Sequence, residues 1–150
     1  MLYSQSLALI DLAVADLLTI YQVDAPPIPV ELMLQRPKAG LWEAADPNEL
    51  TNSAGMRQNK YTLRMSVSRL LARSISLSQW GHDHNLSVLE YDKEALRAFA
   101  RAILMPRKML EQIYEGIRTP PVIAMRFQVP AEDAQLRLLD LGYAEVNSEP

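Results

Sequence analysis

The chain has no cysteine among its 150 residues. This absence excludes disulfide bonds, metal sites built on thiolates and thiol nucleophiles. Histidine is scarce as well, with two residues, and no Gly-x-Ser-x-Gly motif is present. A catalytic serine triad needs a histidine base and is often built on such a motif, so a triad is not indicated.

A large net charge is also missing. The formal charge of −3 at pH 7 provides no general attraction to nucleic acid or to an anionic membrane. The first residues lack the basic region of a signal peptide, and Asp11 and Asp16 interrupt the first apolar segment. That segment therefore stays shorter than the roughly 20 residues that a membrane-spanning helix needs. We expect a cytoplasmic protein that does not bind membranes.

The composition is that of a soluble globular domain. Hydrophobic residues make up 49% of the chain and charged residues 22%, and 150 residues are enough for one domain with its own core. We predict a mainly helical α+β domain over residues 1–143, with a helical subdomain at about 106–143. Residues 144–150 are predicted to form a frayed tail.

Helical periodicity accounts for most of this prediction. Apolar residues recur at three- and four-residue steps in several segments, bounded by residues that favour helix ends. The predicted helices are 3–22, a short helix opened by Pro29, a central helix from about residue 59 or 61 to Gln79 closed by Gly81, a helix 93–104 capped by Asp92, a helix from Pro106 through Ile117, and two helices around a turn at 128–130, the second closed by Gly142.

Two segments lack this periodicity. Residues 37–60 are rich in proline, asparagine and glycine, which favours turns, so at most a small strand beginning at Pro37 or a loop is expected there. Residues 87–91 are predicted to be partly extended. The β component of the predicted fold is therefore small.

The central helix includes the segment Arg64-Met-Ser-Val-Ser-Arg-Leu-Leu-Ala-Arg73. Arg69 and Arg73 are four residues apart, which places them on one face about one helical turn from each other. Two adjacent guanidinium groups repel each other, so they require solvent, an acidic partner or an anion. What these two side chains contact is the main functional question that the sequence raises.

Several segments, in their order along the chain, resemble the ImmA/IrrE-type zinc metallopeptidases, which have a minimal zincin-like domain. The family has a Pro-Val-x-Val-Glu start to its second helix, an Arg-Phe-Thr-Leu-Ala-His-Glu-Leu-Gly-His helix, a helix ending Phe-Ala-x-x-Leu-Leu-Met-Pro, and an Ala-x-x-Phe-x-Val-Ser unit before a helix ending in Leu-Gly. The matching segments here are Pro27–Glu31, Arg64–Arg73, Ala95–Pro106, Ala124–Pro130 and Leu141-Gly142. The resemblance implies a reduced zincin-like fold.

The resemblance does not extend to the catalytic residues. In the family, two histidines of the central helix bind zinc, a glutamate next to the first acts as general base, and a glutamate on the following helix is the third ligand. These positions are occupied by Arg69, Arg73, Leu70 and Ala95, with Glu94 adjacent. An arginine has no free lone pair for zinc, and a leucine cannot carry a proton.

The resemblance thus implies an inactive relative with no cofactor. We expect a pseudo-peptidase scaffold that binds another protein, of the regulator or toxin–antitoxin type. Three alternatives for Arg69 and Arg73 stay open: solvent exposure, ion pairs with Glu94, Asp92 or Glu90 in the former cleft, or a pocket for an anion or a partner's carboxylate.

Two further functions stay open. A metal-dependent hydrolase could use a relocated site at His82 and His84 with an acidic residue from 90–94, because His-x-His and carboxylates are suitable zinc ligands. A nucleic-acid-binding regulator could use a basic face over Arg57–Arg73. The acidic residues of the last predicted helix disfavour nucleic acid.

Overall fold

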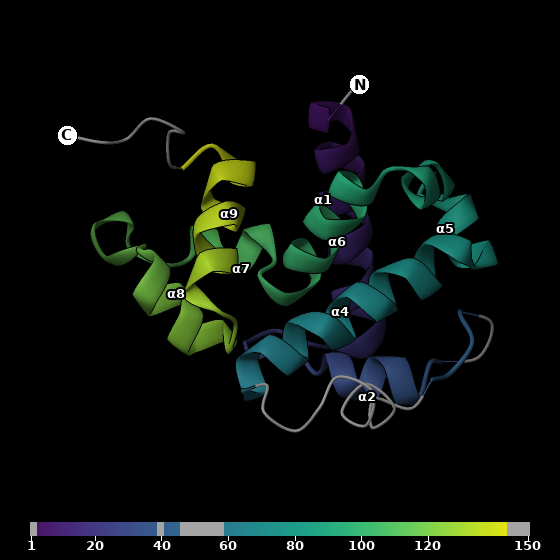
Figure 1. The fold of residues 1–150 in the computed structure, drawn as a ribbon, viewed down its shortest axis with the longest axis horizontal. Helices are drawn as coiled ribbons and strands as arrows, with labels where there is room; N and C mark the ends of the chain where they lie inside the picture. Colours follow the sequence, from purple (N-terminus) through teal and green to yellow (C-terminus); the bar gives the residue numbers. More distant parts are fainter. Residues whose placement is uncertain (1–2, 39–40, 46–58, 144–150) are drawn as a thin grey trace.

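A computed structural model describes residues 3–38, 41–45 and 59–143, and every regular element in these ranges is helical (Figure 1). The prediction of a mainly helical chain is confirmed. The α-helices are α1 (Tyr3–Tyr21), α2 (Val30–Gln35), α4 (Lys60–Leu77), α5 (Gln79–Asp83), α6 (Lys93–Leu104), α7 (Arg107–Glu111), α8 (Pro120–Phe127) and α9 (Ala131–Leu141), and the 3-10 helices are η1 (Ser87–Tyr91) and η2 (Glu115–Ile117).

The predicted β component is absent from the described residues. Residues 37, 38 and 41–45 form no strand, and the rest of segment 37–58 lies outside the described ranges. Residues 87–91 form the 3-10 helix η1 instead of an extended segment. The side chain of Leu89 in η1 is fully buried. Its burial against the helices explains why this connection is folded back rather than extended.

Capping residues determine several helix ends, of which those at Asp92 and Gly142 were predicted from the sequence. The side chain of Asn59 accepts a hydrogen bond from the Thr62 N–H at 2.9 Å and begins α4, and Asp92 accepts one from the Ala95 N–H at 3.1 Å and begins α6. Gly142 has φ +79°, a left-handed conformation that suits glycine, and it ends α9.

The predicted end of the central helix is wrong. Helix α4 ends at Leu77, because the hydroxyl of Ser78 accepts a hydrogen bond from the Gly81 N–H at 3.0 Å and starts the separate helix α5. Gly81 therefore lies inside a helix and is not a left-handed cap. The predicted helix 106–117 is also interrupted, since α7 ends at Glu111 and η2 follows it.

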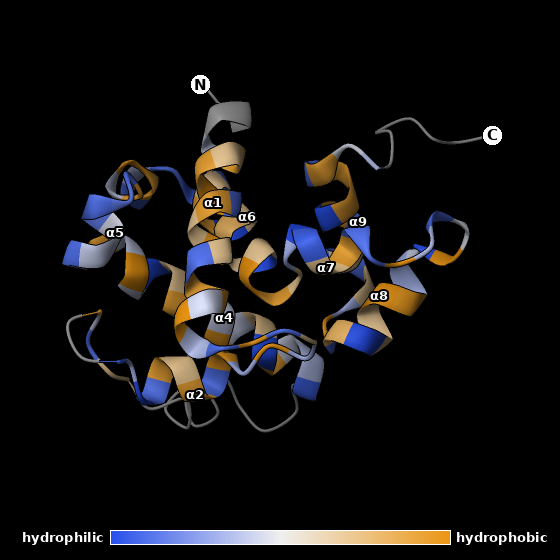
Figure 2. Ribbon diagram, turned by 180° about the vertical axis from the view of Figure 1, so that it is seen from behind, coloured by the Kyte–Doolittle hydropathy of each residue, from blue (hydrophilic) through white to orange (hydrophobic). Residues whose placement is uncertain are grey.

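Helix α6 lies at the centre of the molecule. It packs against α4, α1 and α9, while α2 packs against α4 and α8 packs against α9 (Figure 1). Hydrophobic and hydrophilic residues are both present along helices such as α4, α8 and α9 in Figure 2, as expected for helices with one buried side. Fully buried members of the core include Ile10, Met33, Leu71, Phe99, Ile103 and Phe127.

Burial of such side chains supplies most of the stabilisation of a fold of this kind, at about 1.5–3 kcal/mol for each large apolar side chain. None of the helices in the described ranges is long and apolar enough to cross a lipid bilayer.

Candidate functional site

The outward face of α4 carries the two arginines identified in the sequence. Arg69 and Arg73 are both exposed, whereas Leu70 between them is half-buried. Neither guanidinium has a hydrogen bond or an ion pair with any residue in the ranges 3–38, 41–45 and 59–143. Of the three alternatives for these residues, the structure shows solvent exposure.

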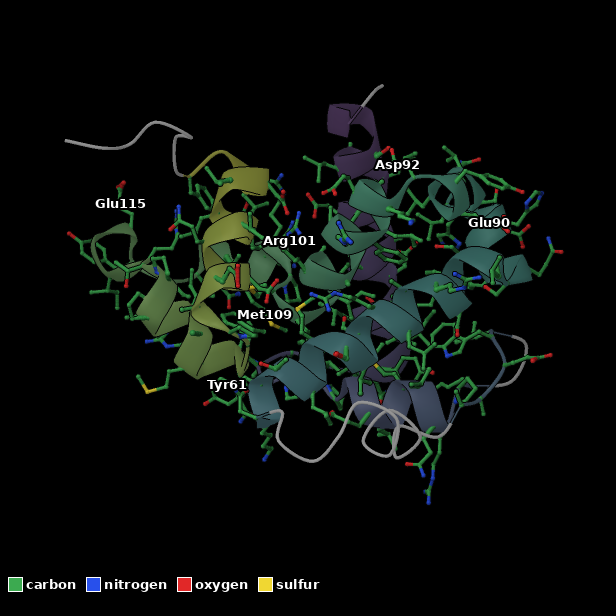
Figure 3. The ribbon with its side chains drawn as sticks, in the orientation of Figure 1. Tyr61, Glu90, Asp92, Arg101, Met109 and Glu115 are labelled. Atoms are coloured by element: carbon green, nitrogen blue, oxygen red, sulfur yellow. The ribbon has the colours of Figure 1, made fainter. Side chains whose placement is uncertain are left out.

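The expected ion pairs with the acidic residues near α6 are not formed. The carboxylate of Asp92 accepts from the Ala95 N–H, and Glu94 pairs with Arg97 at 2.9 Å. In Figure 3, Asp92 lies at the start of α6 and Glu90 lies farther away, on the side of α5, whereas Arg101 of α6 faces α9. The acidic residue whose charge acts on Arg69 is instead Asp133 of α9.

Asp133 has a perturbed carboxyl group. Its burial raises its pKa above the ordinary value of 3.8, and the positive charges of Arg69 and Arg101 oppose this rise. The net direction is upward because loss of hydration destabilises the charged carboxylate more than the two arginines stabilise it. Asp133 therefore balances only part of the positive charge on the face of α4.

The four positions that would hold zinc and its base do not fit a metal ion. Arg69 and Arg73 offer no lone pair, Leu70 has no proton to transfer, and Ala95 of α6 is fully buried with only a methyl side chain. No group of three or more histidine, aspartate or glutamate side chains suitable for a metal occurs within the described residues.

The two histidines do not form a shared site with a carboxylate from 90–94. His82 is exposed. The ring of His84 stacks on Trp80 with centroids 3.8 Å apart; its Nδ1 lies 2.8 Å from the Trp80 carbonyl oxygen and its Nε2 lies 3.1 Å from Oδ2 of Asp16. Both ring nitrogens thus have protein partners: Nδ1 contacts the backbone of α5 and Nε2 contacts Asp16 of α1.

The basic face expected from the sequence is also incomplete. Lys60 is exposed, but Arg64 points into the protein and is 5% exposed, so it is not available to phosphates. Arg57 lies outside the described residues. Within the described part of this face, only Lys60, Arg69 and Arg73 can meet an external anion.

Arg64 connects three segments that are distant in the sequence. Its Nη1 donates to both oxygens of Glu31, at 3.0 and 3.2 Å, and its Nη2 donates to the carbonyl oxygen of Ile28 at 3.0 Å. On the other side, its Nε donates to the carbonyl oxygen of Gln128 at 3.1 Å, and Nη2 also reaches that of Phe127 at 3.4 Å. One buried guanidinium thereby joins α2, α4 and the end of α8.

A second charged network was not foreseen from the sequence. Arg137 of α9 is 0% exposed; its Nη2 donates to Oδ1 of Asp11 at 3.0 Å and its Nε donates to the carbonyl oxygen of Met105 at 2.9 Å. Arg107 of α7 donates to Oδ2 of the same Asp11 at 2.8 Å. Burial lowers the pKa of Arg137, and the charge of Asp11 opposes this shift.

Arg101 and Asp140 extend this network between α6 and α9. Their two hydrogen bonds measure 2.9 and 3.1 Å, and the side chains are 7% and 6% exposed. Arg137 follows Ala134 at the apolar spacing of α9 and precedes Leu138. The position of Arg137 among the apolar residues of α9 is the feature of the sequence from which a buried ion pair could have been predicted.

Hollows on the surface of the described residues include one beside α1 and one beside α4. The groove beside α1 and α7 has a volume of about 1130 Å³, and two of its charged residues, Asp11 and Arg107, pair with each other. A smaller hollow of about 570 Å³ lies at the end of α4, where Ser74, Leu77 and Ser78 meet Leu41 and Trp42. The smaller hollow is therefore next to the face that carries Arg69 and Arg73.

Comparison of the chain with protein-family models, with curated proteins and with solved structures finds no match. The interpretation of the site therefore depends on the residues themselves. Those residues form an exposed arginine pair on α4, beside a small hollow and above a core joined by buried ion pairs.

Proposed function

We propose that this chain is a non-catalytic relative of the ImmA/IrrE-type zinc peptidases, and that it acts by binding another protein. The scaffold is a reduced zincin-like domain whose catalytic face has been replaced. A regulator or a toxin–antitoxin-type protein is the class of partner that the family resemblance suggests.

The contacts of Arg64 carry this proposal. Three of the five segments that resemble the family are Pro27–Glu31, Arg64–Arg73 and Ala124–Pro130, and Arg64 forms hydrogen bonds to residues of both other segments. These segments are separated by more than 30 residues of sequence. Their meeting at one buried guanidinium gives a physical reason for these residue types to occur together in one fold.

The residues of the α4 face support a non-catalytic role. At the positions of the ligands and the base, the side chains are Arg69, Leu70 and Arg73, and none of them can bind zinc or transfer a proton at neutral pH. Exposed guanidinium groups, which have no carboxylate partner within the described ranges, are suited instead to recognition of carboxylates on another molecule. Loss of catalysis with retention of the helix fits a binding role.

Metal analysis and a peptidase assay test the absence of catalysis. The purified chain is expected to contain no stoichiometric zinc and to cleave no peptide library substrate, with or without added zinc. Stoichiometric zinc that is lost in the His82→Ala, His84→Ala double variant would contradict the proposal and favour the relocated hydrolase.

A reconstruction experiment tests the scaffold. Arg69→His with Arg73→His places two potential ligands four residues apart on α4, and Ala95→Glu adds a third from α6. If α4 and α6 keep the zincin-like arrangement, the triple variant binds zinc at least about ten-fold more tightly than the double-histidine variant. Thr62→His with Ser66→His, tested with and without Ala95→Glu, is the matched control on the same helix.

The control separates scaffold geometry from simple helix chemistry, because any pair of histidines four residues apart binds zinc weakly. The zincin-like scaffold would be contradicted if Ala95→Glu raised the zinc affinity equally in the Arg69, Arg73 and the Thr62, Ser66 double-histidine variants. It would also be contradicted if Ala95→Glu did not raise the zinc affinity of the Arg69, Arg73 variant while circular dichroism showed that the triple variant stays helical.

A further inference from the structure

We infer that the exposed face of α4 is the docking surface for an acidic segment of the partner protein. The carboxylates of this segment contact Arg69 and Arg73, and a large apolar side chain that follows them enters the hollow beside Leu77. This inference rests on the proposed protein-binding function and names the chemistry of the partner.

The charge of α4 is the first observation. The helix contains Lys60, Arg64, Arg69 and Arg73 and no acidic residue, in a chain whose formal charge is −3. Arg64 is neutralised by Glu31. Other arginines of the described chain are held by carboxylates, namely Arg97 by Glu94, Arg101 by Asp140, and Arg107 and Arg137 by Asp11.

Arg69 and Arg73 differ from these residues, because they are neighbours on one helix face and neither has a carboxylate partner within the described ranges. Asp133 of α9 is the acidic residue in the described ranges whose charge is coupled to that of Arg69, and burial raises the pKa of its carboxyl group. The two guanidinium groups together present a site for two carboxylates about one helical turn, or about 6 Å, apart.

The hollow at the end of α4 is the second observation. Leu77 follows Arg73 by one further turn, is 53% exposed, and lines the hollow of about 570 Å³ with Trp42 and Ser78. Leu41 and the largely buried Trp42 give the hollow apolar contacts besides Leu77, while Ser74, Ser78 and Gln79 make the rest of its lining polar and the exposed Glu43 disfavours an acidic group there. The surface therefore has a cationic end and an end of mixed polar and apolar character that carries no cation.

The order of the two arginines and the hollow along α4 determines the order of acidic and apolar residues in the partner segment. The segment from Arg69 through Arg73 to Leu77 covers nine residues of α4, and its eight steps correspond to a rise of about 12 Å. A complementary helix has two acidic residues four positions apart and a leucine or phenylalanine four positions beyond, which is the usual spacing of anchors when a helix binds a protein surface. Carboxylates recognised by arginines then determine orientation, and the apolar anchor adds affinity.

Nucleic acid fits this surface less well. Binding to a phosphate backbone uses many cations along a continuous face. Here Asp133 is electrostatically coupled to Arg69, the hollow beyond Arg73 carries Glu43 and no cation, and Arg64 is turned inward. An acidic peptide uses both ends of the surface, whereas a phosphate backbone uses only one.

The test uses fluorescence anisotropy with the full chain and three labelled probes. The first is a 15-residue helical peptide with two glutamates four positions apart and a phenylalanine four positions beyond the second. The second replaces both glutamates by glutamine, and the third is a single-stranded oligonucleotide of 15 nucleotides. We expect measurable binding of the first probe and at least about ten-fold weaker binding of the other two.

Variants locate the site. Arg69→Gln with Arg73→Gln is expected to weaken binding of the acidic peptide by about ten-fold, and Leu77→Asp by a similar factor. Asp133→Asn removes the competing carboxyl group, so it is expected to tighten binding. The control Arg36→Gln with Arg126→Gln removes two exposed arginines of other segments and is expected to leave the affinity unchanged.

Each contrary result has a defined meaning. Equal affinities for the glutamate and glutamine peptides, unchanged affinity in the Arg69, Arg73 variant, or tighter binding of the oligonucleotide would overturn the docking surface and leave the non-catalytic scaffold standing. Site-specific binding followed by cleavage of the peptide would instead overturn the proposed function and leave the docking surface standing.

Discussion

The guanidinium of Arg64 on α4 contacts the carboxylate of Glu31 on α2, with Nη1 3.0 Å from Oε1 and 3.2 Å from Oε2. The arginine side chain is 6% exposed and that of the glutamate 42%. The carboxylate is thus partly hydrated, while the arginine depends on its protein contacts. The remaining donors of Arg64 bind backbone carbonyl oxygens of Ile28, Phe127 and Gln128, so this pair is part of a junction between three segments.

Arg64→Ala is expected to destabilise the fold by about 2–4 kcal/mol, because buried carbonyl oxygens lose their donor and Glu31 loses its counter-charge. Glu31→Gln is expected to cost less than about 1 kcal/mol, since Glu31 is half-exposed and its pairing is screened. Urea unfolding at pH 7 followed by circular dichroism measures both. Equal costs for the two variants would show that the junction depends on the ion pair and not on the backbone contacts.

The ion pair between Arg101 and Asp140 joins α6 to α9 and is nearly inaccessible to water, with side chains 7% and 6% exposed. Asp140→Asn removes the charge that Arg101 contacts in this environment, and the expected loss of stability is about 3–5 kcal/mol. The matched control is Glu94→Gln, which breaks the exposed pair with Arg97 and should cost less than about 0.5 kcal/mol. Thermal and urea unfolding distinguish these values; similar losses in the two variants would contradict the role of burial.

The predictable parts of this fold are those determined by neighbouring residues. Asp92 begins α6 and Gly142 ends α9 as expected, because a cap acts within one helical turn. The early end of α4 was missed, although it is also local, since Ser78 caps α5 and interrupts an apolar period that continues through Trp80. A period alone does not reveal a break that a single hydroxyl group stabilises.

The candidate site was predictable in part. The spacing of Arg69 and Arg73 placed both on one face of α4, and the structure shows them exposed there. Their exposure was one of three alternatives, because periodicity does not show which charges a second helix brings nearby. The contacts of Arg64 with Gln128 and of Arg137 with Asp11 cross 64 and 126 residues of sequence. Such contacts depend on tertiary packing, which local pattern does not determine.

Gly81 is needed for close packing and not for a turn. A Cβ atom at this position would lie 1.9 Å from the carbonyl oxygen of Ile75, which is backbone and cannot rotate away. Gly81→Ala is therefore expected to cost at least about 1–3 kcal/mol. Gly116→Ala is the control, because its Cβ would meet only the exposed side chain of Tyr114, which can move. Chemical denaturation of both variants checks the difference, and equal stability would contradict the close contact.

The carboxyl group of Asp133 should make stability depend on pH. Burial raises its pKa in the folded chain above the ordinary value of 3.8, so the folded state binds more protons than the unfolded state between these two values. By linkage, the contribution of Asp133 to stability falls as pH rises through this window and stays low at neutral pH.

Asp133→Asn removes this penalty. The variant is expected to be more stable than the parent chain at pH 7, by less than about 1 kcal/mol because the group is partly hydrated. The difference should shrink as pH falls through the raised pKa of the folded chain, because the aspartate of the folded state then becomes protonated and its burial penalty is lost. Urea unfolding of both proteins at several pH values between 4 and 7 tests this. A difference that grows on acidification would mean that the charges of Arg69 and Arg101 outweigh burial, and that Asp133 neutralises the α4 face instead of leaving it free for a partner.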